Sequence, residues 1–211
     1  MAAASSSPLR FVTAASLFDG HDASISIVRR ILQDQGCEVI HLGHNRSVAE
    51  IVDAAIQEDA HGIAVSSYQG GHVEFFKFMV DRLRSQGAGH VRVFGGGGGV
   101  IVPAEREELM AYGVECIYSP EDGQRLGLAG MITDMMDRAR RAVRAPRLAE
   151  SLIETLYGAG RYESAAAPAL AELISQAENA VLSAPERALL SQRAAQRTMP
   201  VLGVTGTGGA G

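Results

Sequence analysis

Short apolar runs alternate with amphipathic stretches along residues 10–143, and this pattern predicts a repeated strand–helix unit. The apolar run at 10–17 is followed by Ile25, Val28 and Leu32 at helical spacing, as expected for a strand and then a helix with one buried face. Further strands are predicted at 37–43, 62–68, 90–94 and 114–118. Five such β/α units favour an α/β fold of the Rossmann type, a doubly wound parallel sheet in the flavodoxin-like order 2-1-3-4-5.

Capping residues mark where several of these helices begin and end. Ser47 and Glu50 match the S-x-x-E capping box at the start of the second helix. Pro103 and Gly113 suit the first and the closing positions of the fourth helix, and Ser119 can open the fifth. The helix boundaries therefore agree with the division into five units.

The chain changes character beyond this α/β part. Residues 144–199 are rich in alanine, leucine and arginine, with breaks at 158–160, Pro168 and Pro185, which predicts a linker of three short helices. Residues 1–9 are expected to be disordered, and the last stretch predicts an apolar strand entering a glycine-rich turn. A group of arginines is expected to lie at a solvated helix end and is assigned no function. They are Arg138, Arg140, Arg141, Arg144 and Arg147.

Composition and charge exclude several classes of protein. With 46% hydrophobic and 20% charged residues, the chain is neither disordered nor fibrous. A net charge of −5 offers no positive field for a polyanion, so nucleic acid is not an expected partner. No apolar run approaches the roughly 20 residues that span a bilayer, and residues 1–10 lack a secretory pattern. No membrane association is expected, and the cytoplasm is the expected compartment.

The reactive residue types are few. Cys37 and Cys116 have no metal-binding or disulfide spacing and are expected to be buried free thiols. Lys77 is the only lysine and is predicted on the solvent-exposed face of an amphipathic helix. The chain therefore offers almost no candidate residue for Schiff-base chemistry.

Ligands of doubly wound sheets bind at the carboxyl ends of the strands near the switch point, here between the first and third strands. The loops at these ends are therefore the candidate site, and all of them are small, polar or glycine-rich. They are Phe18–Ser24, Ser66–Gly71, Gly95–Gly99 and Ser119–Pro120.

His21 allows two interpretations. Its imidazole could give one nitrogen to a metal while the other donates to Asp19, which would fix the tautomer and raise the basicity of the ring. Alternatively, His21 is a surface histidine beside a helix cap at Asp22. Without a second histidine or cysteine nearby, a metal would have to arrive already coordinated, as in a macrocycle. The other histidines are expected at the surface or at strand edges, namely His41, His44, His61, His72 and His90.

The five glycines at 95–99 remove every side chain where the backbone leaves a strand, which permits close approach of a bulky ligand. A flexible loop is the alternative interpretation. A dinucleotide fingerprint does not fit, because Val100 occupies the third small position and the run follows the fourth strand.

Taken in order, these segments resemble the cobalamin-binding domain of the adenosylcobalamin-dependent mutases, whose pattern is Asp-x-His-x-x-Gly, then Ser-x-Leu, then Gly-Gly. Residues 19–24 match the first element except for Ser24 in the glycine position. After 41 residues, 66–68 match the second, with Tyr68 in place of leucine. The third element falls within 95–99, and the resemblance covers about residues 10–143.

The resemblance implies that cobalamin binds with its own dimethylbenzimidazole displaced, His21 becoming the lower axial ligand of cobalt and Asp19 tuning it. The nucleotide tail would enter a slot between the sheet and the first helix, and homolysis of the cobalt–carbon bond would start a radical rearrangement. The cofactor-binding residues implied are Asp19, Gly20, His21, Asp22, Ala23, Ser24, Ser66, Ser67, Tyr68, Gly70, Gly71, Gly96, Gly97, Gly98, Gly99 and Ser119.

The order of the segments along the chain indicates which group of these mutases the chain resembles. Residues 200–211 look like the start of a phosphate loop, with Gly206, Gly208, Gly209 and Gly211 in the glycine-rich part, although a disordered tail is the alternative. A cobalamin domain followed by a P-loop GTPase is similar to the fused isobutyryl-CoA mutases, in which the GTPase is a chaperone, whereas methylmalonyl-CoA mutases carry the cobalamin domain last.

The implied partners are an acyl-CoA-binding barrel and a GTPase domain using GTP and Mg²⁺ in a homodimeric parent enzyme that interconverts isobutyryl-CoA and n-butyryl-CoA. This chain alone is expected to bind adenosylcobalamin without turnover. A methylmalonyl-type mutase domain and a flavodoxin-like nucleotide- or FMN-binding module without catalysis remain alternatives.

Overall fold

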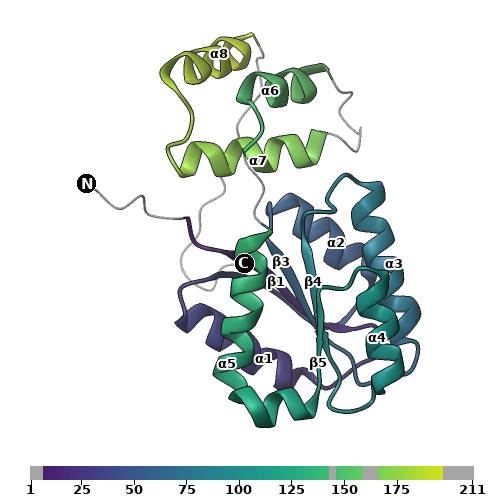
Figure 1. Cartoon of the computed structure of the whole chain (residues 1–211). Coiled ribbons are helices and arrows are strands. Elements are labelled where there is room, and N and C mark those ends of the chain that lie inside the picture. Colours follow the sequence, from purple (N-terminus) through teal and green to yellow (C-terminus); the bar gives the residue numbers. More distant parts are fainter. Residues whose placement is uncertain (1–6, 143–145, 159–165, 197–211) are drawn as a thin grey trace, which may run out of the picture.

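The computed structural model describes residues 7–142, 146–158 and 166–196, and it contains one parallel sheet of five strands in the order β2-β1-β3-β4-β5 (Figure 1). This order confirms the predicted topology. The strands are β1 (Arg10–Ser16), β2 (Glu38–Arg46), β3 (Gly62–Ser66), β4 (Arg92–Gly96) and β5 (Cys116–Tyr118). The helices are α1 (Asp22–Asp34), α2 (Val48–Gln57), α3 (His72–Ser85), α4 (Pro103–Tyr112), α5 (Pro120–Arg141), α6 (Ala149–Gly158), α7 (Ala166–Glu178) and α8 (Ala184–Ala195).

Strand β1 lies between β2 and β3, and its apolar sequence explains this central position. Phe11 is aligned with Val39 of β2 and with Gly62 of β3, and Phe11 and Val12 are both fully buried. A strand covered on both faces needs such a continuous apolar run. The pairing of β1 with β2 shifts register after Thr13.

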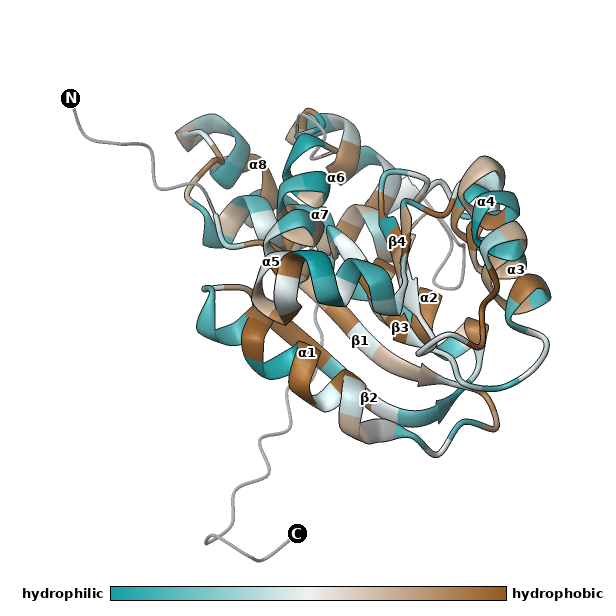
Figure 2. Cartoon of the chain, turned by 60° about the horizontal axis from the view of Figure 1, so that its bottom comes forward, coloured by the Kyte–Doolittle hydropathy of each residue, from teal (hydrophilic) through white to brown (hydrophobic). Residues whose placement is uncertain are grey.

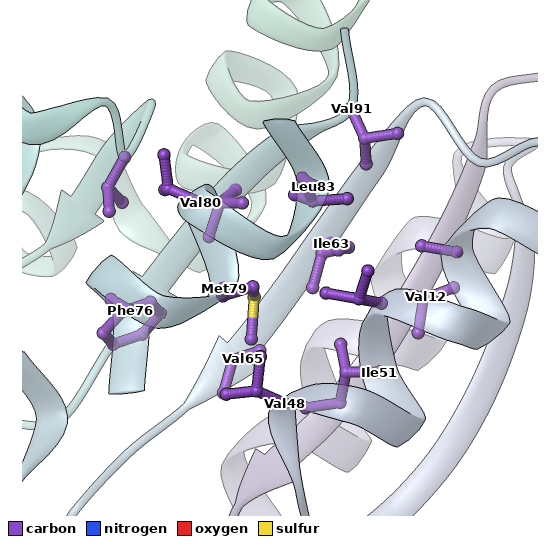
Figure 3. Close-up of a cluster of buried hydrophobic side chains, with 14 of the residues drawn as sticks. Val12, Val48, Ile51, Ile63, Val65, Phe76, Met79, Val80, Leu83 and Val91 are labelled. Carbon is purple, nitrogen blue, oxygen red and sulfur yellow. The ribbon is translucent and has the colours of Figure 1, made fainter. Parts of the chain in front are cut away.

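Helices α2, α3 and α4 cover one face of the sheet, where the larger apolar cluster lies (Figures 1 and 3). Ile51 of α2 and Met79 of α3 are fully buried in this cluster with Ile63 of β3. Phe76 and Leu83 also face the sheet, as the spacing in α3 predicts.

Helices α1 and α5 cover the opposite face. Ile25 and Leu32 of α1 meet Ile132 and Met135 of α5 in a second apolar cluster. Figure 2 shows brown and teal residues mixed in both helices, whereas β1 and β3 are largely brown. Each helix therefore has one apolar face for the sheet and one polar face for solvent.

Local capping interactions fix the helix boundaries. The Ser47 hydroxyl accepts a hydrogen bond from the backbone N–H of Glu50, and the Glu50 carboxylate accepts one from the N–H of Ser47, so the predicted capping box is confirmed. Gly113, with φ 130°, closes α4 as expected. Helix α5 is interrupted at Gly127, where φ 65° and ψ 167° break the helical path.

Helices α6, α7 and α8 form a separate bundle with its own core, which includes Leu152 and Leu173. This agrees with the three predicted helices, although Pro168 and Pro185 lie in the first turns of α7 and α8 instead of between helices. The Arg10 guanidinium, at the amino end of β1, donates to the hydroxyl of Ser175 in α7 at 3.2 Å. The bundle is therefore attached at the amino end of the sheet.

Other expectations concern single residues. Cys37 and Cys116 are buried free thiols, and burial raises the pKa of Cys37 to about 11. Lys77 lies on α3, where its ammonium pairs with the Glu108 carboxylate and stands 5.3 Å from the Tyr112 ring centroid. None of the helices in the described ranges has the length and apolar character to cross a membrane.

Arg138, Arg140 and Arg141 lie in the last turn of α5, as predicted. Arg138 and Arg140 bind Asp134 and Asp137 of the same helix, and Arg147 lies beyond it, bonded to Glu172. Arg144 and the glycines of the expected phosphate loop lie outside the described residues, because residues 143–145 and 197–211 are not described. The same holds for residues 1–6 of the expected disordered segment.

Candidate functional site

The loops that leave β1, β3, β4 and β5 meet at the carboxyl edge of the sheet. The Ser16 hydroxyl at the end of β1 donates to the Ser67 hydroxyl at 2.9 Å, and both side chains are buried. The backbone N–H of Ser67 donates to the carbonyl of Gly96 at 2.8 Å. These bonds join the loops that the sequence predicts as the site.

Asp19 is the centre of the polar network in this region. Its side chain is fully buried, and Oδ2 accepts the backbone N–H of Tyr68 at 2.6 Å. Oδ1 accepts the backbone N–H of His21 and also its ring Nδ1–H, both at 2.9 Å. Burial alone would raise the pKa of Asp19, but the donors from Tyr68 and His21 outweigh it and hold the pKa below 3.8. Asp19 is therefore a carboxylate that binds two loops together.

The same contact orients His21. A carboxylate can only accept, so Nδ1 carries the proton and Nε2 keeps a free lone pair. The His21 side chain is 67% exposed, and its ring centroid lies 5.3 Å from that of Tyr68. Helix α1 begins at Asp22 with His21 itself at the N-cap position, so the expectation of a cap at Asp22 is wrong. His21 is thus both exposed and held in one orientation.

A cavity of about 440 Å³ opens beside Tyr68, between α1, the ends of β3 and β4, and α5. Ser24 and Ser66 line it, and both hydroxyl oxygens are buried without a hydrogen-bond partner in the described structure. A buried hydroxyl without a partner is costly, so it commonly indicates a missing ligand or water.

The glycine run forms one wall of this cavity. A Cβ on Gly97 would come within 2.1 Å of the Ser67 carbonyl oxygen. Gly98 has φ 55°, and a Cβ there would lie 2.4 Å from the Tyr68 ring. At these two positions glycine is needed for close approach of the two loops, which a merely flexible loop would not require.

The structure brings together only part of the predicted set. The predicted residues that line the cavity are Ser24, Ser66, Tyr68, Gly96, Gly97, Gly98 and Ser119. The predicted residues outside its lining are Asp19, Gly20, His21, Asp22, Ala23, Ser67, Gly70, Gly71 and Gly99. Gly71, with φ 81°, instead occupies the N-cap position of α3.

The apolar wall of the cavity was missed in the list of binding residues. It comes from α1, β3, β4, β5 and α5, and helical spacing was the available signal for the residues of α1 and α5. Its members are Ile25, Ile27, Val28, Ala64, Val65, Phe94, Gly95, Tyr118, Pro120, Gly123, Leu128, Met131, Ile132 and Met135.

His41, His61 and His72 make contacts within the fold. His41 and His61 lie in or beside strands, where their Nδ1 atoms contact the Thr13 hydroxyl and the backbone N–H of Arg10. The expectation is wrong for His72, which is buried at the start of α3, where its Nε2 lies 2.9 Å from Glu105 of α4. In the described ranges, no three His, Cys, Asp or Glu side chains are grouped to hold a metal ion.

A family model described as B12 binding domain matches residues 9–123. The chain belongs to the B12-binding domain family. The B12-binding domain also has the fold of a cobalamin-binding protein from Desulfitobacterium hafniense, with a TM-score of 0.50 and 22% identity over 64% of this chain and 59% of that one.

Its relatives are mutases. The chain is 61% identical to the fused isobutyryl-CoA mutase of Cupriavidus metallidurans and 55% identical to that of Geobacillus kaustophilus, over 96% of its own length in each case. It spans only 18% and 19% of those proteins. The small subunit of 2-hydroxyisobutanoyl-CoA mutase from Aquincola tertiaricarbonis is 38% identical over 43% of this chain and 66% of that subunit. The chain is thus a cobalamin-binding domain similar to those of acyl-CoA mutases.

Proposed function

We propose that this chain binds adenosylcobalamin with His21 as the lower axial ligand of cobalt. The observation that carries the proposal is the Asp19–His21 pair, which leaves Nε2 free on an exposed imidazole at the carboxyl edge of the sheet. A hydrogen bond from Nδ1 to a carboxylate raises the basicity of the ligating nitrogen and fixes the direction of the ring.

The neighbouring cavity suits the nucleotide tail of the cofactor. The hydroxyls of Ser24 and Ser66 lack partners and can donate to phosphate or sugar oxygens. The glycine wall lets a ligand approach the backbone, and the apolar side chains of Ile25 and Met135 exclude water from the slot. The residues present therefore fit the chemistry of the nucleotide tail.

When bound, the cofactor supplies a cobalt–carbon bond that can be cleaved homolytically. The residues of this chain hold it and set its orientation. Asp19 keeps the proton on Nδ1 of His21, and the backbone N–H of Tyr68 holds the Asp19 carboxylate in place. The Tyr68 ring also restricts the His21 ring on the side toward β3. The chain thus binds and positions the cofactor.

We further propose that the parent enzyme interconverts isobutyryl-CoA and n-butyryl-CoA. The 61% identity to a fused isobutyryl-CoA mutase supports this choice over a methylmalonyl-CoA mutase, to which the chain is 29% identical over 102 residues. An acyl-CoA barrel, a GTPase domain using GTP and Mg²⁺, a homodimer and a cytoplasmic location belong to the same proposal. The chain by itself binds the cofactor without turnover.

Electron paramagnetic resonance of bound cob(II)alamin tests the axial ligand. A coordinated ¹⁴N nucleus splits each cobalt line into three, whereas ¹⁵N splits it into two. We expect two lines with protein labelled with [¹⁵N]histidine and no histidine splitting in His21→Ala. His90→Ala, at the amino end of β4, is the matched control and should keep the splitting. A three-line pattern that stays the same when histidine is labelled with ¹⁵N would overturn the proposal.

A further inference from the structure

Phe18 has an unusual combination of backbone strain and exposure. Its φ is 63°, and the residue is 80% exposed. The backbone N–H of Asp19 donates to the carbonyl of Ser16 at 3.0 Å, which makes Phe18 the third residue of a β-turn. Leu17 has a negative φ, so the turn is of the type II class.

Glycine or asparagine is the usual residue at this position, because a left-handed backbone brings a Cβ too close to the carbonyl oxygen. An aromatic side chain at this position costs folding free energy. Because the ring is exposed, burial of apolar surface does not offset that cost. Strain of this kind is characteristic of functional sites.

The surrounding structure holds Phe18 in this conformation. Its backbone N–H donates to the side-chain oxygen of Asn45 at 2.9 Å, and Asn45 itself has φ 55°. Asn45 belongs to β2, so the turn is fixed on the side of β1 opposite to Tyr68, which follows β3. The turn also sets the position of Asp19, the residue that orients His21.

We infer that Phe18 is a cofactor-contacting residue whose ring packs against the macrocycle of a corrin bound at His21. The inference rests on the proposed function. A macrocycle is far wider than an imidazole, so one held by Nε2 of His21 covers neighbouring parts of the same loop. An exposed apolar ring three residues before the ligand matches its largely apolar body and gains burial only when the cofactor is bound.

The test separates strain from contact. Phe18→Gly removes the ring and the left-handed penalty together, whereas Phe18→Leu keeps an apolar side chain at the same backbone. Ala180→Gly is the matched control, because Ala180 also has φ 55° and lies in the turn between α7 and α8. Each variant of the whole chain is titrated with adenosylcobalamin by absorption, and the melting temperature is measured without cofactor.

Phe18→Gly should bind adenosylcobalamin about tenfold more weakly while its melting temperature without cofactor equals or exceeds that of the wild type. Phe18→Leu should recover most of the affinity, and Ala180→Gly should leave it unchanged. Wild-type affinity in Phe18→Gly would overturn the inference. That result would leave the proposed function standing, provided that histidine coupling persists in the spectrum of the wild type.

Discussion

Replacement of Asp19 by asparagine changes one atom of the buried carboxylate and tests how His21 is held. If the remaining oxygen stays on the His21 donors, the new amide group faces the backbone N–H of Tyr68, which now lies 2.6 Å from Oδ2. Two donors then oppose each other in a site without access to solvent.

The expected cost has two parts. An unsatisfied buried N–H destabilises by about 1–3 kcal/mol, and loss of the negative charge weakens the bond from Nδ1 by roughly 1 kcal/mol. The free energy of unfolding should fall by about 2–4 kcal/mol, which leaves a domain of ordinary stability folded. Because the hydrogen bond that orients the His21 ring is weaker, affinity for the cobalt of cob(II)alamin should fall about 10–100-fold.

Urea unfolding gives the first quantity, and absorption titration with cob(II)alamin gives the second. Asp81→Asn is the matched control, since the exposed Asp81 carboxylate accepts from the Tyr112 hydroxyl on the surface of α3. It should change both quantities little. An Asp19→Asn protein with wild-type stability and wild-type affinity would refute the role derived for this carboxylate.

Three further changes give separate tests. Ser66→Ala removes a buried hydroxyl without a partner, so thermal unfolding without cofactor should show a free energy of unfolding about 1 kcal/mol higher. Titration with adenosylcobalamin should show an affinity reduced up to tenfold. A decrease in both stability and affinity would contradict the assignment. Gly97→Ala places a Cβ against the Ser67 carbonyl and should lower the free energy of unfolding in urea by about 3 kcal/mol, whereas Gly70→Ala, where the space is open, should change it little; equal effects would disprove the close approach. Burial lowers the pKa of His61 from the ordinary 6.5, so the neutral ring stabilises the fold above that pH, and this stability is lost as the pH falls. The free energy of unfolding in urea, measured across pH 5–8, should depend less on pH in His61→Gln. An unchanged pH dependence would refute this role.

Much of the α/β part could be predicted because its signals are local. The spacing of apolar residues gave the helix faces, as at Phe76 and Leu83, and the capping box at Ser47 gave a helix start. The loops of the candidate site followed from the strand order, since the carboxyl ends of parallel strands share one edge.

Features that depend on long-range packing could not be predicted in the same way. The pair of His72 and Glu105 joins positions 33 apart on two helices. The contribution of Met131 to the cavity depends on how α5 crosses the sheet after its break at Gly127. The left-handed turn at Phe18 contradicts the preference of its own side chain, so no local rule indicates it.

The attachment of α7 at Arg10 has a consequence for the rest of the molecule. Strand β1 has seven residues, so its two ends are separated by about 20 Å, and His21 follows the end remote from α7. In the described structure, the bundle of α6, α7 and α8 therefore leaves the approach to the imidazole open, and a large neighbour can close over it without moving these helices.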